Sequence, residues 1–290
     1  MQIPQQAAAR SALNDAAFVL SEAGINNAPG EARLLLEHVL GHRPGYGERL
    51  DGPTWQRFFE LVGQRATRVP LQHVMGVMYF RHLTLHARPG VFVVRPETEW
   101  VAQGAIDAAA DWVRQGVAPR VLDLGCGSGA LGLSIASEVP ESILTCVDVS
   151  EAAVDLTVEN ARFAGVAARV LRADATDSQT LRNALVSAEI PPKFHVIATN
   201  PPYVVDPVTQ PEAAQDPQLA LYGGGADGLE RPRAFLAAAA AVAAPGATIV
   251  MEHAESQGAA LVQAAQALGL RDAQTRFDLA GRPRFLQALA

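Results

Sequence analysis

Three glycines at residues 125, 127 and 129 interrupt an apolar stretch in the segment VLDLGCGSGALGL. Strand-like residues precede them and helix-like residues follow, which predicts a tight strand-to-helix turn. Glycine lets the backbone approach a ligand closely, and the free N–H groups at a helix start favour a carboxylate or a phosphate. The segment therefore predicts a ligand-binding loop, although a glycine-rich turn without a ligand would have the same spacing.

Polar side chains stand at the ends of four predicted strands: Asp123, Asp148, Asp174 and Asn200. Because ligands of open α/β sheets bind at the carboxyl ends of strands, these residues are expected to face one crevice. An acid at the position of Asp148 accepts hydrogen bonds from ribose hydroxyls, and Asp174 could accept from an adenine amine or be an ordinary loop residue. NAD-binding chains place an acid similarly, but Leu131–Gly132 does not match their G-x-G-x-x-G pattern.

The elements that must position these residues alternate along the second part of the chain. Strand patterns at 120–124, 142–150, 168–177, 194–200, 247–254, 271–279 and 282–289 are separated in most cases by helical patterns of about 10–15 residues. This alternation is typical of parallel β-α-β units in a doubly wound α/β sheet.

The first part of the chain has a different pattern. Helical periodicity at 7–23, 28–41 and 54–69, the last with Thr54 as a candidate N-cap, predicts a small all-α domain over residues 1–74. Residues 75–98 alternate apolar and polar positions around Arg88–Pro89–Gly90, which predicts a β-hairpin linker. The remaining domain is expected to span 99–290.

Composition narrows the classes of function. The 290 residues carry a net charge of −7 and are 49% hydrophobic, so a sizeable core is expected and stable nucleic-acid binding is disfavoured. Cys126 and Cys146 are expected to be reduced core thiols, and scattered histidines predict no metal site. The sequence shows no pattern of a signal peptide or a membrane span, which predicts a cytoplasmic protein.

The segment NPPY, residues 200–203, together with the glycine loop and the acids, resembles the S-adenosylmethionine-dependent methyltransferases with an [N/D/S]-PP-[Y/F] motif. Those enzymes methylate a planar nitrogen whose lone pair is tied up in resonance. The resemblance implies that the Asn200 side-chain oxygen and the Pro201 carbonyl accept from the two N–H bonds and stabilise the positive charge growing on nitrogen. Tyr203 would stack on the planar group.

Motifs outside this core resemble the release-factor glutamine N5-methyltransferases over nearly the whole chain. They are PLQHVMG, RPETE, LALYGGGADGL, EHAESQG and DLAGRPRFLQA. The resemblance implies a seven-stranded, Rossmann-like methyltransferase domain and, as substrate, the glutamine of the Gly-Gly-Gln loop of class-1 peptide chain release factors. The chain departs from the family pattern at His73, His82, Val94 and Ala175.

The resemblance also implies roles for individual residues. The catalytic set is Asn200, Pro201, Pro202 and Tyr203. The residues expected to bind S-adenosylmethionine, and its product S-adenosylhomocysteine, are Asp123, Gly125, Cys126, Gly127, Ser128, Gly129, Asp148, Val149, Asp174, Ala175 and Asn200. The residues expected to bind substrate are Phe92, Arg95, Glu97, Thr98, Asn200 and Tyr203. Methylation of a nucleic-acid amino group and non-catalytic cofactor binding are the alternatives.

Overall fold

A computed structural model describes residues 6–290 and divides the chain into two compact units. One unit contains the chain up to Val77 together with Val208–Gln215. The other contains Met78–Pro207 and Asp216–Ala290. The segment Val208–Gln215 therefore belongs to the N-terminal unit although it follows the NPPY residues in the sequence.

The N-terminal unit is built from helices that bury one apolar face each. Its elements are α1 (Ala9–Glu22), α2 (Ala28–Leu40), α3 (Gly52–Ala66), α4 (Leu71–Met75) and a short antiparallel pair, β1 (Gln6–Ala8) with β2 (Arg49–Asp51). The side chains of Leu35, Leu36 and Phe58 are fully buried between the helices. The predicted cap of α3 was wrong: the Asp51 side chain accepts from the Thr54 backbone N–H at 2.9 Å, so the helix begins before Thr54.

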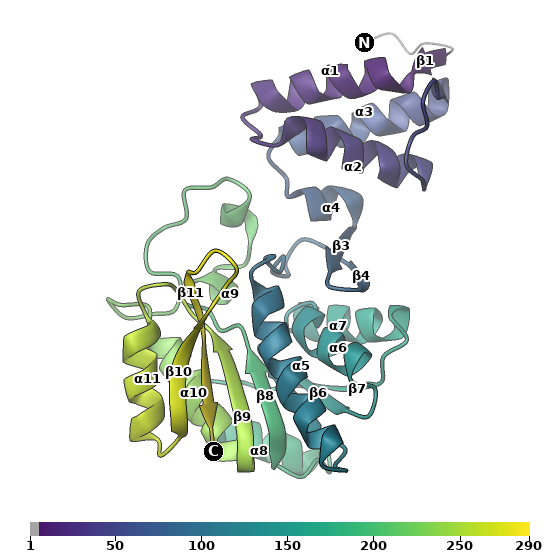
Figure 1. Cartoon of the computed structure of the whole chain (residues 1–290). Coiled ribbons are helices and arrows are strands. Elements are labelled where there is room, and N and C mark those ends of the chain that lie inside the picture. Colours follow the sequence, from purple (N-terminus) through teal and green to yellow (C-terminus); the bar gives the residue numbers. More distant parts are fainter. Residues whose placement is uncertain (1–5) are drawn as a thin grey trace. The chain divides into compact units, whose positions relative to one another are not determined.

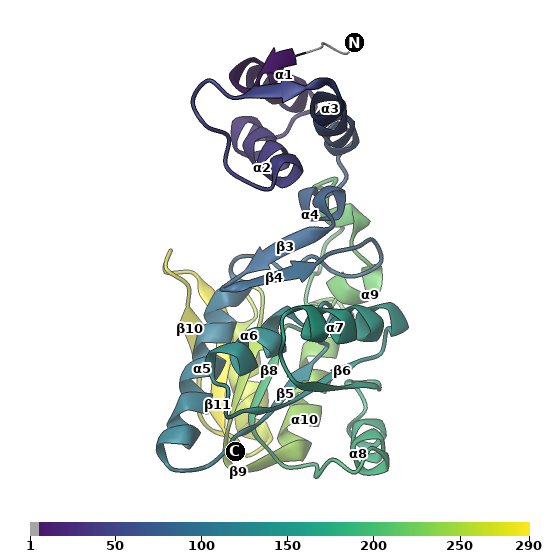
Figure 2. The ribbon, with the colours of Figure 1, turned by 90° about the vertical axis from the view of Figure 1, so that its right-hand side faces the viewer.

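The second unit is organised around a seven-stranded sheet in the order β10-β11-β9-β8-β5-β6-β7, which confirms the predicted doubly wound α/β class (Figures 1 and 2). The strands are β5 (Arg120–Leu124), β6 (Ile143–Asp148), β7 (Ala168–Arg172), β8 (Phe194–Thr199), β9 (Ala243–Glu252), β10 (Arg271–Phe277) and β11 (Pro283–Leu289). Neighbours from β7 to β9 pair in parallel, whereas β11 is antiparallel to both β9 and β10.

Helices cover both faces of this sheet. The helices are α5 (Thr98–Arg114), α6 (Ala130–Glu138), α7 (Glu151–Phe163), α8 (Ser178–Ser187), α10 (Glu230–Val242) and α11 (Gly258–Ala267). Along β5, Val121 packs in one apolar cluster with residues of α5 and α6, and Leu122 packs in the other with residues of α8 and α10. Because side chains alternate between the faces of a strand, near-continuous apolar strands fill both clusters.

The predicted hairpin is shorter than expected, and its turn lies elsewhere. Strands β3 (Val77–Phe80) and β4 (Leu83–His86) meet at Arg81, which has a φ of 50°, and not at Arg88–Pro89–Gly90. Arg81 is held in this left-handed conformation by contacts distant in sequence, because its backbone N–H donates to Glu99 and its side chain pairs with Glu138. Because the turn at Arg81 contains neither glycine nor proline, the local sequence did not indicate its position.

Between β8 and α10 the chain contains little regular structure. It includes the 3₁₀ turn Ala213–Gln215, the short helix α9 (Gln218–Leu221) and an isolated bridge between Val204 and Tyr222. The backbone N–H of Val204 donates to the Leu221 carbonyl at 2.8 Å. The residues directly after NPPY are thus tied to α9.

Candidate functional site

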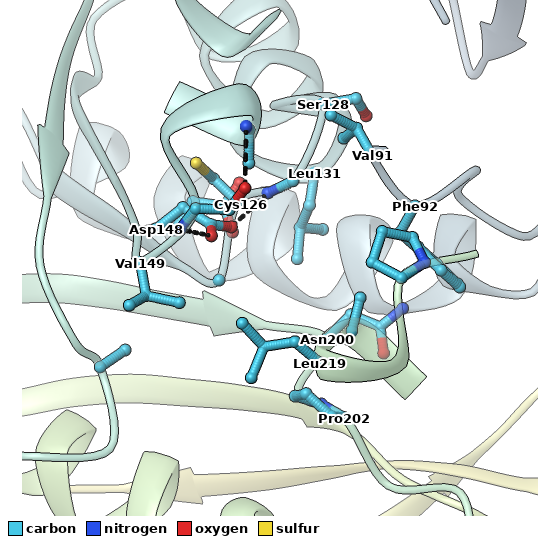
Figure 3. Close-up of a pocket in the computed structure, with 18 of the residues that line it drawn as sticks. Val91, Phe92, Cys126, Ser128, Leu131, Asp148, Val149, Asn200, Pro202 and Leu219 are labelled. Atoms are coloured by element: carbon cyan, nitrogen blue, oxygen red, sulfur yellow. Dashed lines mark hydrogen bonds between the residues drawn. The ribbon is translucent and has the colours of Figure 1, made fainter. Parts of the chain in front are cut away.

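One cavity of about 290 Å³ lies in the second unit, beyond the carboxyl ends of β5, β6 and β8. Figure 3 shows Asp148 and Val149 at one end of it, and Phe92 and Asn200 toward the other. Predicted site residues that line it are Phe92, Thr98, Asp123, Gly125, Cys126, Gly127, Ser128, Asp148, Val149, Asp174, Ala175, Asn200 and Pro202. The predicted residues outside that lining are Arg95, Glu97, Gly129, Pro201 and Tyr203.

The glycine loop between β5 and α6 has a conformation that favours glycine. Gly125, Gly127 and Gly129 all have positive φ, at 72°, 56° and 80°. A Cβ atom on Gly125 would approach the Phe235 ring to 3.1 Å, whereas one on Gly127 would meet no atom of the described chain within 4 Å. The loop therefore leaves open space beside Gly127, which lines the cavity.

Asp148, the last residue of β6, shapes this loop from the neighbouring strand. One carboxylate oxygen accepts from the Gly127 N–H at 2.9 Å, and the other accepts from the Ser150 N–H at 2.9 Å. Burial raises the pKa of Asp148 while these backbone N–H groups lower it. The carboxylate thus holds the glycine loop in place and still lines the cavity.

Asp123 supports the next turn of the loop. It is buried, and its Oδ2 accepts from the Gly132 N–H in the first turn of α6 at 2.8 Å. Burial is the main cause that raises the pKa of Asp123 to about 7. This bond explains the polar residue inside an apolar strand: it joins the end of β5 to the helix start.

The remaining predicted cofactor contacts lie at the end of β7 and in the glycine loop. Asp174 accepts from the backbone N–H and the hydroxyl of Thr176, at 2.8 and 2.6 Å. Cys126 and Cys146 are buried free thiols. A hydrogen bond with Cys146 and burial raise the pKa of Cys126 well above its usual value, and the pKa of Cys146 is also raised, by burial against the lowering effect of its hydrogen bond with Cys126. Both therefore stay protonated near neutral pH.

The NPPY turn begins where β8 ends. The Asn200 side-chain nitrogen Nδ2 donates to the Thr98 hydroxyl oxygen at 3.3 Å, which leaves Oδ1 available as an acceptor. Thr98, the first residue of α5, is fully buried and also lines the cavity. The helix start and the strand end therefore orient the amide together.

Tyr203 has a contact that the sequence did not indicate. Its hydroxyl donates to Glu252 Oε1 at 2.9 Å. Burial and the negative charge of Glu252 raise the pKa of Tyr203 far above its usual value, so the phenol remains a donor. The ring is absent from the cavity lining, and its expected stacking role stays a prediction.

Glu252 is the functional candidate that sequence reasoning missed. It is fully buried at the end of β9, and burial raises its pKa to about 7, while hydrogen bonds with Thr98 and Tyr203 lower that pKa. The available signal was an acid that ends an apolar strand, as in EHAESQG. The same segment supplies Gln257, whose Nε2 donates to the Tyr203 carbonyl at 3.0 Å.

The segment before α5 divides into residues inside and outside the cavity lining. Phe92 lines the cavity, and the Arg95 guanidinium lies 4.8 Å from the centre of its ring. Arg95 also pairs with the buried Asp216, while Glu97 lies 3.9 Å from Arg284. Arg95 therefore joins the Phe92 ring to Asp216 without itself lining the cavity.

Two sequence families match the chain in tandem. Residues 11–76 match the family described as PrmC N-terminal domain, and residues 82–217 match the methyltransferase small domain. In residues 6–290, the structure contains no helix that combines the length and apolarity needed to cross a membrane.

Curated relatives align over nearly the full chain. The release factor glutamine methyltransferase of Bifidobacterium longum is 38% identical, over 96% of this chain and 98% of that protein. The protein of the same name from Deinococcus radiodurans is 36% identical, over 96% and 97%. The 4-amino-L-phenylalanine/4-methylamino-L-phenylalanine methyltransferase of Streptomyces pristinaespiralis is 35% identical, over 89% and 87%.

A solved structure is similar at the level of the fold. The Thermus thermophilus 16S rRNA N2 G1207 methyltransferase, in complex with AdoMet and guanosine, has a TM-score of 0.50 and 22% identity, covering 73% of this chain and 49% of that chain. This structure supports the fold alone, whereas the curated relatives are similar to this chain over nearly its full length.

Proposed function

Because this chain belongs to the release factor glutamine methyltransferase family, we propose that it transfers a methyl group from S-adenosylmethionine to the side-chain amide nitrogen of a glutamine in a peptide chain release factor. The expected glutamine is that of the Gly-Gly-Gln loop of class-1 factors. The observation that carries the proposal is the cavity itself, which joins a glycine loop and Asp148 to Asn200, Pro202 and Phe92.

The glycine-loop end of the cavity fits S-adenosylmethionine. The open space beside Gly127 would accept the amino-acid portion close to the backbone, and α6 begins directly after the loop. Asp148 and Asp174, at the ends of β6 and β7, would accept from the ribose and the adenine, respectively. The bound cofactor supplies an electrophilic methyl group on a positively charged sulfur.

The Asn200 end of the cavity fits a planar amide. Asn200 Oδ1 and the Pro201 carbonyl accept from the two N–H bonds of the glutamine, which holds the nitrogen toward the methyl group and stabilises its developing positive charge. The Phe92 ring forms the aromatic wall beside the side chain. The nitrogen loses its extra proton to solvent after transfer, so no strong general base is required.

A methyl-transfer assay with mass spectrometry of the Gly-Gly-Gln peptide tests this function. The purified enzyme is incubated with S-adenosylmethionine and an intact class-1 release factor, and a mass increase of one methylene is expected on the glutamine. A release factor with Gln replaced by Glu in that loop is the matched control. Transfer to the control at the same rate would show that another residue is modified.

The same assay separates the other acceptors. A relative 35% identical to this chain is named for an amino-phenylalanine, so 4-amino-L-phenylalanine is included together with DNA and RNA. Transfer to any of these with none to the release factor would overturn the proposed substrate. The net charge of −7 predicts that the nucleic acids are not modified.

A further inference from the structure

Glu252 combines complete burial with a position beside the NPPY turn. It ends β9, the strand that pairs with β8 through Thr199 and Met251. Val250, two residues earlier on the same face, packs in the apolar cluster that contains residues of α5. Glu252 therefore faces the side of the sheet on which α5 lies.

The partners of this carboxylate connect it to both ends of the NPPY turn. Oε1 accepts from the Tyr203 hydroxyl at 2.9 Å, and Thr98 shares a side-chain hydrogen bond with the carboxylate. Thr98 in turn accepts from Asn200 Nδ2. Within the described chain the second oxygen, Oε2, is buried without a hydrogen-bond partner, so the hydrogen bonds of both hydroxyls go to Oε1.

We propose that Glu252 is a positioning residue that orients the methyl-accepting site through Thr98 and Tyr203. This role rests on the proposed function: through Thr98, Glu252 decides whether Asn200 presents Oδ1 or Nδ2 to the substrate. Glu252 itself is absent from the cavity lining, so it acts without touching the substrate.

The direction of the hydrogen bonds makes the orientation specific. A hydroxyl has one proton, and when Glu252 is ionised its carboxylate can only accept, so the Thr98 proton is directed to it. The Thr98 oxygen must then accept from Asn200, and only Nδ2 can donate. The Asn200 amide is thereby held with Oδ1, rather than Nδ2, available to the glutamine N–H.

A purely structural role for Glu252 would be pairing with the nearby buried cation. Arg284 is buried near the same end of the sheet, but its ion-pair partners are Glu97, Glu255 and Asp278, at 3.9, 3.9 and 3.4 Å. Glu252 is not among the ion-pair partners of Arg284 in residues 6–290. Its direct contacts are instead the two hydroxyls that reach the turn.

The decisive variant is Glu252→Gln, which preserves shape but adds an N–H₂ group. Where that group takes the place of Oε1, it donates to Thr98, so the Thr98 proton turns to Asn200 and favours a flipped amide. We expect kcat to fall about 10- to 100-fold, in line with the loss of a charge-assisted hydrogen bond. The dissociation constant for S-adenosylmethionine should remain within about twofold, because Glu252 lies outside the cavity.

The matched control is Glu255→Gln, in the same segment. Glu255 is a half-exposed carboxylate near Arg284, and its replacement should leave kcat within about twofold. Thr98→Ser, which keeps the hydroxyl, should retain most activity, and Thr98→Val should lose it. A uniform loss of kcat, cofactor affinity and melting temperature in Glu252→Gln would show a structural role and overturn the proposal.

A double-mutant cycle tests whether the residues act through one another. If Glu252 orients Asn200 through Thr98, the double variant Glu252→Gln/Thr98→Val should lose no more kcat than the single variant with the larger loss. Losses that multiply would show independent roles and overturn the proposal. Tyr203→Phe, which keeps the ring, provides the second cycle if Thr98→Val fails to fold.

An independent readout keeps this inference separate from the proposed substrate. The Asn200 side-chain N–H₂ resonance, identified by its absence in Asn200→Ala, reports the amide orientation in the protein without substrate. It should shift in Glu252→Gln and Thr98→Val and stay unchanged in Glu255→Gln. An unchanged resonance in Glu252→Gln overturns the positioning role, whereas absent glutamine methylation by the unaltered enzyme contradicts only the proposed function.

Discussion

The two ends of the cavity are built in different ways. At the glycine loop, backbone N–H groups and positive φ angles form the surface, and Asp148 holds the loop from the next strand. At the NPPY turn, side chains from α5, the β8 end and the β9 end hold one another. The first end depends on neighbouring residues, whereas the second depends on contacts between residues about 50 to 100 positions apart.

The end of the cavity at the NPPY turn, with Asn200, Thr98 and Glu252, is called the acceptor end. Asn200→Ala tests it most directly and has the largest expected effect. It removes one of the two acceptors for the glutamine N–H bonds, so kcat should fall about 100- to 1000-fold. Affinity for S-adenosylmethionine, measured by calorimetry, should fall much less than kcat, because the glycine loop and Asp148 are untouched. If this variant loses cofactor affinity as strongly as kcat, the two ends of the cavity do not act separately.

Asp148→Ala tests the opposite end. It removes the carboxylate that accepts from Gly127 and would accept from the ribose, so the dissociation constant for S-adenosylmethionine should rise about 10- to 100-fold. At saturating cofactor, kcat should stay near its original value, because the NPPY turn is intact. Glu151→Gln, an exposed acid three residues further on, is the control and should bind cofactor normally.

Much of the first end could be predicted from the sequence, because its signals are local. Gly125, Gly127 and the acid at the end of β6 follow one another at spacings set by a single β-α-β unit. The acceptor end was only partly predictable. NPPY marked the turn, but nothing local relates Tyr203 to Glu252, because β9 lies beside β8 only once the sheet has formed.

The same reasoning explains the errors in the fold. The strands and helices of the sheet were predicted because their apolar periodicity is local, whereas the hairpin turn at Arg81 depends on Glu99 and Glu138. The cap of α3 was placed at Thr54 because threonine and aspartate are both good caps. Only the structure shows that Asp51 accepts from the Thr54 N–H.

The pH dependence of stability separates Glu252 from an ordinary exposed acid. Its pKa is raised to about 7, chiefly by burial, with Glu97 raising it further, while Thr98, Tyr203 and Arg284 lower it. The folded protein therefore binds this proton more tightly than the unfolded chain, and the contribution of Glu252 to stability falls as the pH rises from about 4.5 through 7.

Glu252→Gln should remove that dependence. The free energy of unfolding of the variant minus that of the unaltered protein should increase by on the order of 2 kcal/mol from pH 5 to pH 8, measured by urea denaturation. Asp123 has a similarly raised pKa, so only the difference between the two proteins is diagnostic. Parallel stability profiles would show that Glu252 does not titrate in this range.

Glu212→Gln should have the smallest effect on catalysis, and it tests how local the acceptor end is. Glu212 follows NPPY in the sequence but pairs with Arg65 and Arg68 in the N-terminal unit, at 2.8 and 2.7 Å. These partners lower the pKa of Glu212 to about 2. The stabilisation is therefore complete above about pH 4.5 and is lost as the pH falls toward 2.

At neutral pH, Glu212→Gln should lower the free energy of unfolding by about 1–2 kcal/mol, and this deficit should shrink in acid. Glu60→Gln, which removes a half-exposed partner of Arg57, should change stability by less than about 0.5 kcal/mol. Asn200 and Tyr203 are held by Thr98 and Glu252, so kcat of the Glu212 variant should stay within about twofold. A large fall in kcat would contradict the prediction that Thr98 and Glu252 are sufficient to hold the NPPY turn.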